Sequence, residues 1–210
     1  MLVLYSGAFG KAVAEALDRN RATEAVPLAD RQGLDELFDR SGDSFVVFAL
    51  DRPHPEFLED LDDSLEARGL RWTAVTLRHR TLICGPLHKP GLGPCWRCYN
   101  RRHLTLTLPP YTPEIESAYN RACDTAMLDE VEGFLPTVVE MAAAQILRHE
   151  QEYEALAHGS MAVFDVFEGS LTPTKVVPLH GCRCRPTESD AGPERFVRHL
   201  RAVLGQGASS

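Results

Sequence analysis

Residues 2–17 read LVLYSGAFGKAVAEAL, and this stretch decides the fold. Its first four residues form an apolar, β-prone run, and Gly7 and Gly10 mark a glycine turn after it. From Lys11 to Leu17, apolar residues recur at helical spacing. The stretch therefore predicts a strand, a glycine turn and a helix, which is how a dinucleotide-binding fold begins.

The glycine turn raises the question of a nucleotide site. Asp30 stands 23 residues after Gly7, at the end of the second predicted strand, where a carboxylate can bind a ribose. The glycine pattern is a degenerate G-x-x-G, with the bulky Phe9 where a phosphate approaches. Only 14 residues separate Asp30 from Phe45, which leaves little room for basic residues that hold a triphosphate. Gly7, Gly10 and Asp30 are thus candidates for a vestigial nucleotide site, the alternative being a functional one, and ATP is not an expected cofactor.

Strands and helices alternate along the first 84 residues. Strands are expected at residues 24–29, 44–50, 72–77 and 80–84, and helices at 34–40 and 53–68. The alternation predicts an α/β fold with a Rossmann-like, mostly parallel sheet and helices on both faces. Further helices at 113–128 and 135–153 follow, and then a hairpin of residues 161–167 and 175–179.

Length and charge exclude several classes of protein. The chain has 210 residues, enough for one domain, and its 22 Lys and Arg against 30 Asp and Glu give a net charge of −8. An acidic chain without a basic run is a poor ligand for a phosphate backbone, so nucleic acid is not an expected partner. No apolar stretch approaches the roughly 20 residues of a membrane span, and no secretion signal opens the chain. We expect a soluble, cytoplasmic protein with no membrane partner.

Four of the six cysteines form two close pairs. Cys95 and Cys98 make a C-x-x-C motif after Gly93-Pro94, and Cys182 and Cys184 make a C-x-C motif after Gly181. In a reducing compartment such pairs favour metal ligation over disulfides. Four thiolates fill a tetrahedral Zn²⁺ shell and leave no open position, which is typical of a structural site. The ion would clip the C-terminal hairpin to the loop after the sheet.

Other interpretations of these residues stay open. Cys95 and Cys98 could instead be a thiol redox pair, and His103 or His180 could replace one sulfur ligand. The arginines near the cysteines either offset the charge of the thiolates, the favoured interpretation, or bind an acidic leader peptide; they are Arg97, Arg101, Arg102, Arg183 and Arg185. The acidic residues within 56–66 are expected to form a solvated helix face. No motif of a catalytic nucleophile, metalloprotease or P-loop occurs, so no catalytic residue is predicted.

Taken together, these motifs resemble the ThiF/MoeB class of ubiquitin-activating-enzyme-like proteins. The resemblance rests on the strand–glycine–helix opening, TLICGP at 81–86, PGLGPCWRCY at 90–99, the alanine-rich helix and HGCRC at 180–184. More narrowly, the chain is similar to the divergent branch that works with YcaO cyclodehydratases to make thiazole- and oxazole-modified peptides. The resemblance covers most of residues 1–186, and the stretch at 90–99 is its most specific part.

The resemblance implies a function without catalysis by the chain itself. Proteins of that branch bind zinc through four cysteines, usually form dimers, and present a precursor peptide to the YcaO enzyme, which cyclises Cys, Ser or Thr with ATP. It therefore implies a scaffold with structural Zn²⁺, a YcaO-type cyclodehydratase and a precursor peptide as partners, and a homodimer or hetero-oligomer. The alternatives are an ATP-dependent enzyme that adenylates a peptide or small-protein carboxylate, and a thiol redox protein.

Three departures from the class bear on these expectations. The ATP-binding residues of its active members have no match here, the second cysteine pair is C-x-C, and the chain starts at the first strand. No N-terminal winged-helix module is therefore expected, and leader recognition falls to a separate leader-binding protein or to another surface. We expect one domain over residues 1–186, with its zinc-binding part at about 85–186, and a linker, short helix and flexible tail over 187–210.

Overall fold

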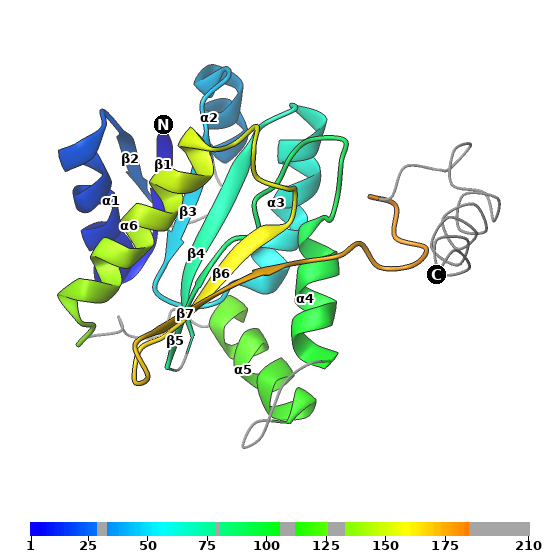
Figure 1. Cartoon of the computed structure of the whole chain (residues 1–210). Coiled ribbons are helices and arrows are strands. Elements are labelled where there is room, and N and C mark those ends of the chain that lie inside the picture. Colours follow the sequence, from blue (N-terminus) through cyan, green and yellow to red (C-terminus); the bar gives the residue numbers. More distant parts are fainter. Residues whose placement is uncertain (29–32, 79, 106–111, 126–132, 185–210) are drawn as a thin grey trace, which may run out of the picture.

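The computed structural model describes residues 1–28, 33–78, 80–105, 112–125 and 133–184 (Figure 1). Its strands are β1 (Leu2–Tyr5), β2 (Glu24–Pro27), β3 (Val46–Leu50), β4 (Trp72–Arg78), β5 (Thr81–Cys84), β6 (Ser160–Asp165) and β7 (Ser170–Lys175). Its helices are α1 (Gly7–Asn20), α2 (Leu34–Ser41), α3 (Pro55–Ala67), α4 (Trp96–Thr105), α5 (Pro113–Thr125) and α6 (Pro136–Gln151). The strands form one sheet in the order β2-β1-β3-β4-β5-β6-β7.

The sheet is mixed, and its first four strands are parallel. β1 pairs with β2 and β3, and β3 pairs with β4, all in parallel, as the alternation of strands and helices predicts. The expectation that this pattern extends to residue 84 is wrong, because β5 runs antiparallel to β4. Only residues 79 and 80 connect the two strands, whereas a parallel pair needs a crossover of a dozen or more residues.

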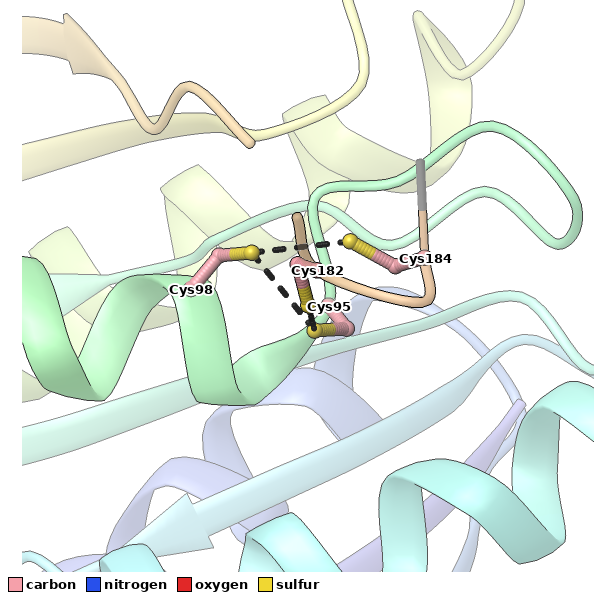
Figure 2. A group of neighbouring side chains, drawn as sticks. All are labelled: Cys95, Cys98, Cys182 and Cys184. Carbon is pink, nitrogen blue, oxygen red and sulfur yellow. Dashed lines mark hydrogen bonds between the residues drawn. The ribbon is translucent and has the colours of Figure 1, made fainter. Parts of the chain in front are cut away.

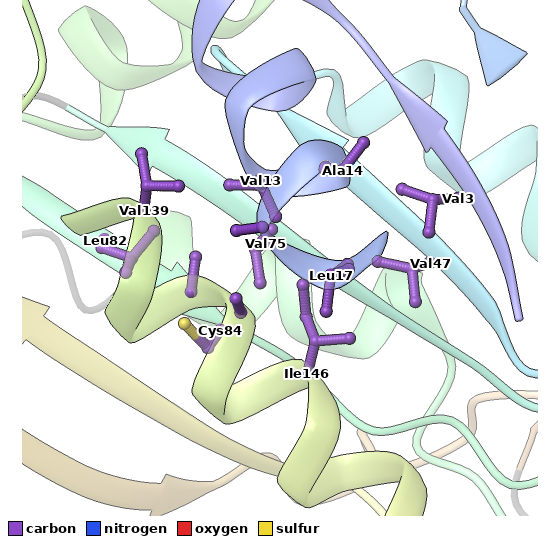
Figure 3. Close-up of a cluster of buried hydrophobic side chains, with 14 of the residues drawn as sticks. Val3, Val13, Ala14, Leu17, Val47, Val75, Leu82, Cys84, Val139 and Ile146 are labelled. Carbon is purple, nitrogen blue, oxygen red and sulfur yellow. The ribbon is translucent and has the colours of Figure 1, made fainter. Parts of the chain in front are cut away.

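Helices cover both faces of the sheet, and two hydrophobic cores result. Alternate residues of one strand enter opposite cores: Val3 contributes to the first, and Leu2 to the second. In the first core, α1 and α6 lie side by side on one face (Figure 3). The second core lies under α2, α3 and α4 on the opposite face. The predicted α/β class with helices on both faces is confirmed.

The end of the described chain differs from expectation in two places. The hairpin of β6 and β7 is present, but its second strand starts at Ser170 because Gly169, with φ +64°, makes the turn immediately before it. Helix α4 was not expected, since residues 96–105 carry no clear apolar period. The predicted linker, helix and tail at 187–210 lie outside the described residues. Within those residues, no helix is both long and apolar enough to cross a bilayer.

A buried histidine ties α6 to the sheet. His149 is 4% exposed, and its Nδ1 shares a hydrogen bond of 3.0 Å with the Thr73 hydroxyl on β4. Burial, with the nearby charge of Arg148, lowers the pKa of His149 from 6.5 to about 4. Between these two values the unfolded chain binds a proton that the folded chain does not. The folded state therefore loses stability as the pH falls from 6.5 towards 4.

We expect the free energy of unfolding, measured by urea titration, to decrease from about pH 7 to about pH 5, and to decrease less steeply in His149→Gln. Glutamine can still meet the Thr73 hydroxyl, but it does not titrate. The difference between the two slopes isolates His149 from other titrating groups, including thiols. Equal slopes in the two proteins would show that His149 is not buried in its neutral form.

Candidate metal centre

The two cysteine pairs meet at the start of α4. Cys95 directly precedes the helix, and Cys98 lies in its first turn, where the backbone N–H of Cys98 donates to the carbonyl of Cys95. Cys182 and Cys184 lie on the segment after β7, which passes beside this turn (Figure 2). The C-x-C motif needs a turn to aim both sulfurs inward. The backbone N–H of Cys182 donates to the carbonyl of Leu179 and closes a turn over residues 179–182 that leads into the motif.

The four sulfur atoms have the spacing of a tetrahedral metal shell. The Sγ distances are 3.6 Å for Cys95–Cys98, 3.5 Å for Cys95–Cys182 and 3.5 Å for Cys98–Cys184, and all four atoms lie within 4.8 Å of one another. Zn–S bonds of about 2.3 Å in a tetrahedron put sulfurs about 3.8 Å apart, whereas a disulfide needs about 2.05 Å. All six cysteines of the chain are free thiols. The four can hold a metal ion.

The protonation of the cluster also calls for a cation. Burial raises the pKa of Cys95, and it raises the pKa of Cys184 to about 12. At Cys182 burial acts in the same direction, but hydrogen bonds from the Cys184 backbone and neighbouring thiols outweigh it and lower the pKa. A thiolate is therefore favoured at Cys182, whereas Cys95 and Cys184 resist ionisation. A divalent ion would supply the charge that ionises all four and would release their protons.

Glycines let the two segments approach each other. A Cβ on Gly93, whose φ is +49°, would lie 2.7 Å from the carbonyl oxygen of Cys184 and 3.3 Å from its sulfur. A Cβ on Gly159 would lie 2.8 Å from Pro94. In addition, the backbone N–H of Leu179 donates to the Cys98 sulfur at 3.2 Å, the kind of bond that favours a thiolate. These close approaches leave no room for a side chain on either glycine.

The acidic face of α3 anchors the centre and is not simply solvated, contrary to expectation. Asp62 is 7% exposed, and its carboxylate accepts a hydrogen bond of 2.7 Å from the backbone N–H of Trp96. Burial raises the pKa of Asp62 to about 7. Two further carboxylates of α3 pair with arginines beside the cysteines: Glu59 with Arg97, and Asp63 with Arg183. Periodicity identified this face as polar but could not show what would dock on it.

The other residues considered near the cysteines have separate places. Arg102 donates to the carbonyls of Val177 and Pro178, at 2.6 and 3.0 Å, and Arg185 lies outside the described residues. His103 stacks on Tyr99 with ring centroids 5.8 Å apart. Within the described chain, the cluster of possible ligand atoms contains the four sulfurs and neither His103 nor His180.

Gly7 and Gly10, two of the predicted nucleotide residues, lie at the carboxyl ends of β1 and β3. A Cβ on Gly10 would lie 2.2 Å from the carbonyl oxygen of Ala49, so this glycine packs α1 against β3. A Cβ on Gly7 would lie 2.3 Å from Oδ2 of Asp51, whose Oδ1 accepts a bond of 2.8 Å from the Ser6 hydroxyl. The 6%-exposed Asp51 carboxylate thus lies at the N-terminus of α1. Asp30 lies outside the described residues, so a nucleotide role for these residues stays a prediction.

Sequence reasoning missed Asp51. An anion beside the first turn of a helix is where a dinucleotide-binding fold places a phosphate, and here a carboxylate of the chain itself takes that position. The available signal was an aspartate directly after the apolar strand that ends in Ala49-Leu50. In an open α/β sheet, ligands bind at the carboxyl ends of the parallel strands, so a polar residue at such an end is a candidate site residue.

Comparison with solved structures identifies the fold. A chain of the E. coli microcin synthetase McbBCD complex aligns with a TM-score of 0.62 and 15% identity, covering 87% of this chain and 67% of that one. The corresponding values are 0.54, 12%, 91% and 67% for E. coli MccB, and 0.53, 15%, 95% and 31% for the heterocyclase TruD. The chain has the fold of these proteins. Neither a protein-family model nor a curated protein matches the sequence.

The likeness agrees with the α/β fold that the sequence resemblance implies. At 12–15% identity it concerns the fold alone, and the chain spans only about a third of the length of TruD.

Replacing Cys98 by serine tests the metal centre. We expect purified wild-type protein to carry one Zn²⁺ per chain by elemental analysis, and Cys98→Ser to lose most of it. Loss of the ion should cost roughly 3 kcal/mol or more of folding free energy and lower Tm by about 6 °C or more. Cys84→Ala is the matched control, because Cys84 is an equally buried cysteine on β5 outside the cluster. Metal content equal in Cys98→Ser and the wild type would exclude the four-sulfur site.

Proposed function

We propose that this protein is a zinc-stabilised, non-catalytic scaffold that presents a ribosomal precursor peptide to a YcaO-type cyclodehydratase in azole or azoline peptide biosynthesis. The observation that carries the proposal is the four-sulfur cluster on this fold. Its four thiols leave no ligand position for a substrate or a reactive water, which fits a structural role for the ion. The protein would act by binding its partners and holding them together.

Two further observations support a binding role. The fold is shared over 87% of the chain with a component of the McbBCD complex, a structure also known with pro-MccB17 bound. At the α1 N-terminus, the Asp51 carboxylate lies where an incoming phosphate would need an unopposed positive potential. The negative charge of a phosphate there would be repelled by the negative charge of this carboxylate. This arrangement favours a scaffold over the alternative of an adenylating enzyme.

Reconstitution with a YcaO-type cyclodehydratase and its precursor peptide tests the function. We expect mass spectrometry to show loss of one water per ring only when this protein, the cyclodehydratase, the peptide and ATP are all present. The Cys98→Ser variant should give little product, while Cys84→Ala should retain activity, because only the former removes a metal ligand. The metal-loaded protein alone should show no ATP–pyrophosphate exchange. Exchange by the protein alone would overturn the scaffold proposal in favour of adenylation.

A further inference from the structure

A basic hollow lies beside the metal centre of this acidic chain. Its volume is about 620 Å³, and its lining includes four arginines and a histidine but, among the described residues, no carboxylate. The basic residues of the lining are Arg97, Arg101, Arg102, His180 and Arg183, and Leu179, Gly181 and Cys182 complete it. Helix α4 forms one wall, and the segment that carries the second cysteine pair forms the other. The metal centre thus fixes the two walls relative to each other.

The arginines of the hollow differ in what holds them. Arg97 and Arg183 pair with the α3 carboxylates of Glu59 and Asp63. The charges of these two arginines are therefore already matched within the protein. Arg101 is exposed and has no hydrogen-bond or ion-pair partner within the described part of the chain. It is available to a ligand.

The position of Arg101 on α4 is electrostatically unfavourable in the folded protein. Arg97 and Arg101 stand four residues apart on α4 and therefore share a helix face, where like charges repel each other. Among the described residues that line the hollow, no carboxylate offsets this repulsion.

We propose that the basic hollow binds an acidic stretch of the precursor peptide, an inference that rests on the proposed function. Charge complementarity identifies the ligand as anionic, and an open hollow with cations on two walls suits an extended chain better than a single small anion. A peptide is favoured over nucleic acid because the neighbouring α3 face also carries Asp60 and Glu66, and the whole chain has a charge of −8. These charges repel a long polyanion but not a short acidic segment seated in the hollow.

Fluorescence anisotropy with the zinc-loaded full chain tests this inference. The probe is a short labelled peptide of alternating Glu and Gly, and the same peptide with Gln in place of Glu is the neutral comparison. We expect the Glu peptide to bind and the Gln peptide to bind at least about tenfold more weakly, with added NaCl weakening the former. Arg101→Glu should weaken binding by about fivefold or more. Arg40→Glu, the same charge change on an exposed arginine of α2, should change it by less than about twofold.

Several results would overturn the inference. Unchanged peptide binding in both Arg101→Glu and the double variant Arg101→Glu/His180→Glu would do so. So would a drop in Tm of Arg101→Glu with no change in peptide affinity, since a helix-stabilising role predicts that pattern. Tighter binding of a single-stranded oligonucleotide than of the Glu peptide would assign the hollow to nucleic acid. Cyclisation activity retained in both Arg101 variants, without peptide binding, would refute this inference and leave the scaffold proposal standing.

Discussion

Four thiol groups in one place are the constraint on which the C-terminal half of the structure depends. Their sulfurs lie within 4.8 Å of one another, and burial opposes the ionisation of Cys95 and Cys184. The two segments that meet there lie more than 80 residues apart in the sequence, and they are also joined by hydrogen bonds from Arg102 to the carbonyls of Val177 and Pro178. A bound ion converts the crowding into a cross-link. Gly93 and Gly159 allow the close backbone approaches beside that cross-link, and the Leu179 N–H donates a hydrogen bond to one of its sulfurs.

The centre is continuous with one of the two hydrophobic cores. Cys98 belongs to the core under α2, α3 and α4, and Cys95, Cys182 and Cys184 pack against it. Trp96 joins the same core through its ring and binds Asp62 and Pro55 through its N–H groups. Loss of the ion is therefore expected to loosen α4 and the segment after β7 while leaving α1, α6 and the parallel strands in place. The basic hollow, whose walls are these two elements, would be lost with it.

The sequence predicted most of the fold and the cysteine cluster, for identifiable reasons. The periodicity of strands and helices and the spacing within each cysteine pair are local patterns. Both can be read from the sequence alone. What periodicity could not show was pairing between elements. The antiparallel β5 followed from a connection of two residues, α4 had no apolar period, and the buried Asp62 had the same spacing as its solvated neighbours. Asp51 at the α1 N-terminus was likewise visible only once β3 and α1 were packed together.

X-ray absorption spectroscopy at the zinc edge of the purified, full-length protein tests the central claim most directly, because it reports the atoms bound to the metal. We expect a first shell of four sulfurs at about 2.3 Å, with no nitrogen or oxygen ligand. A shell that contains nitrogen or oxygen, or a metal-free protein with a Cys95–Cys98 disulfide, would contradict it.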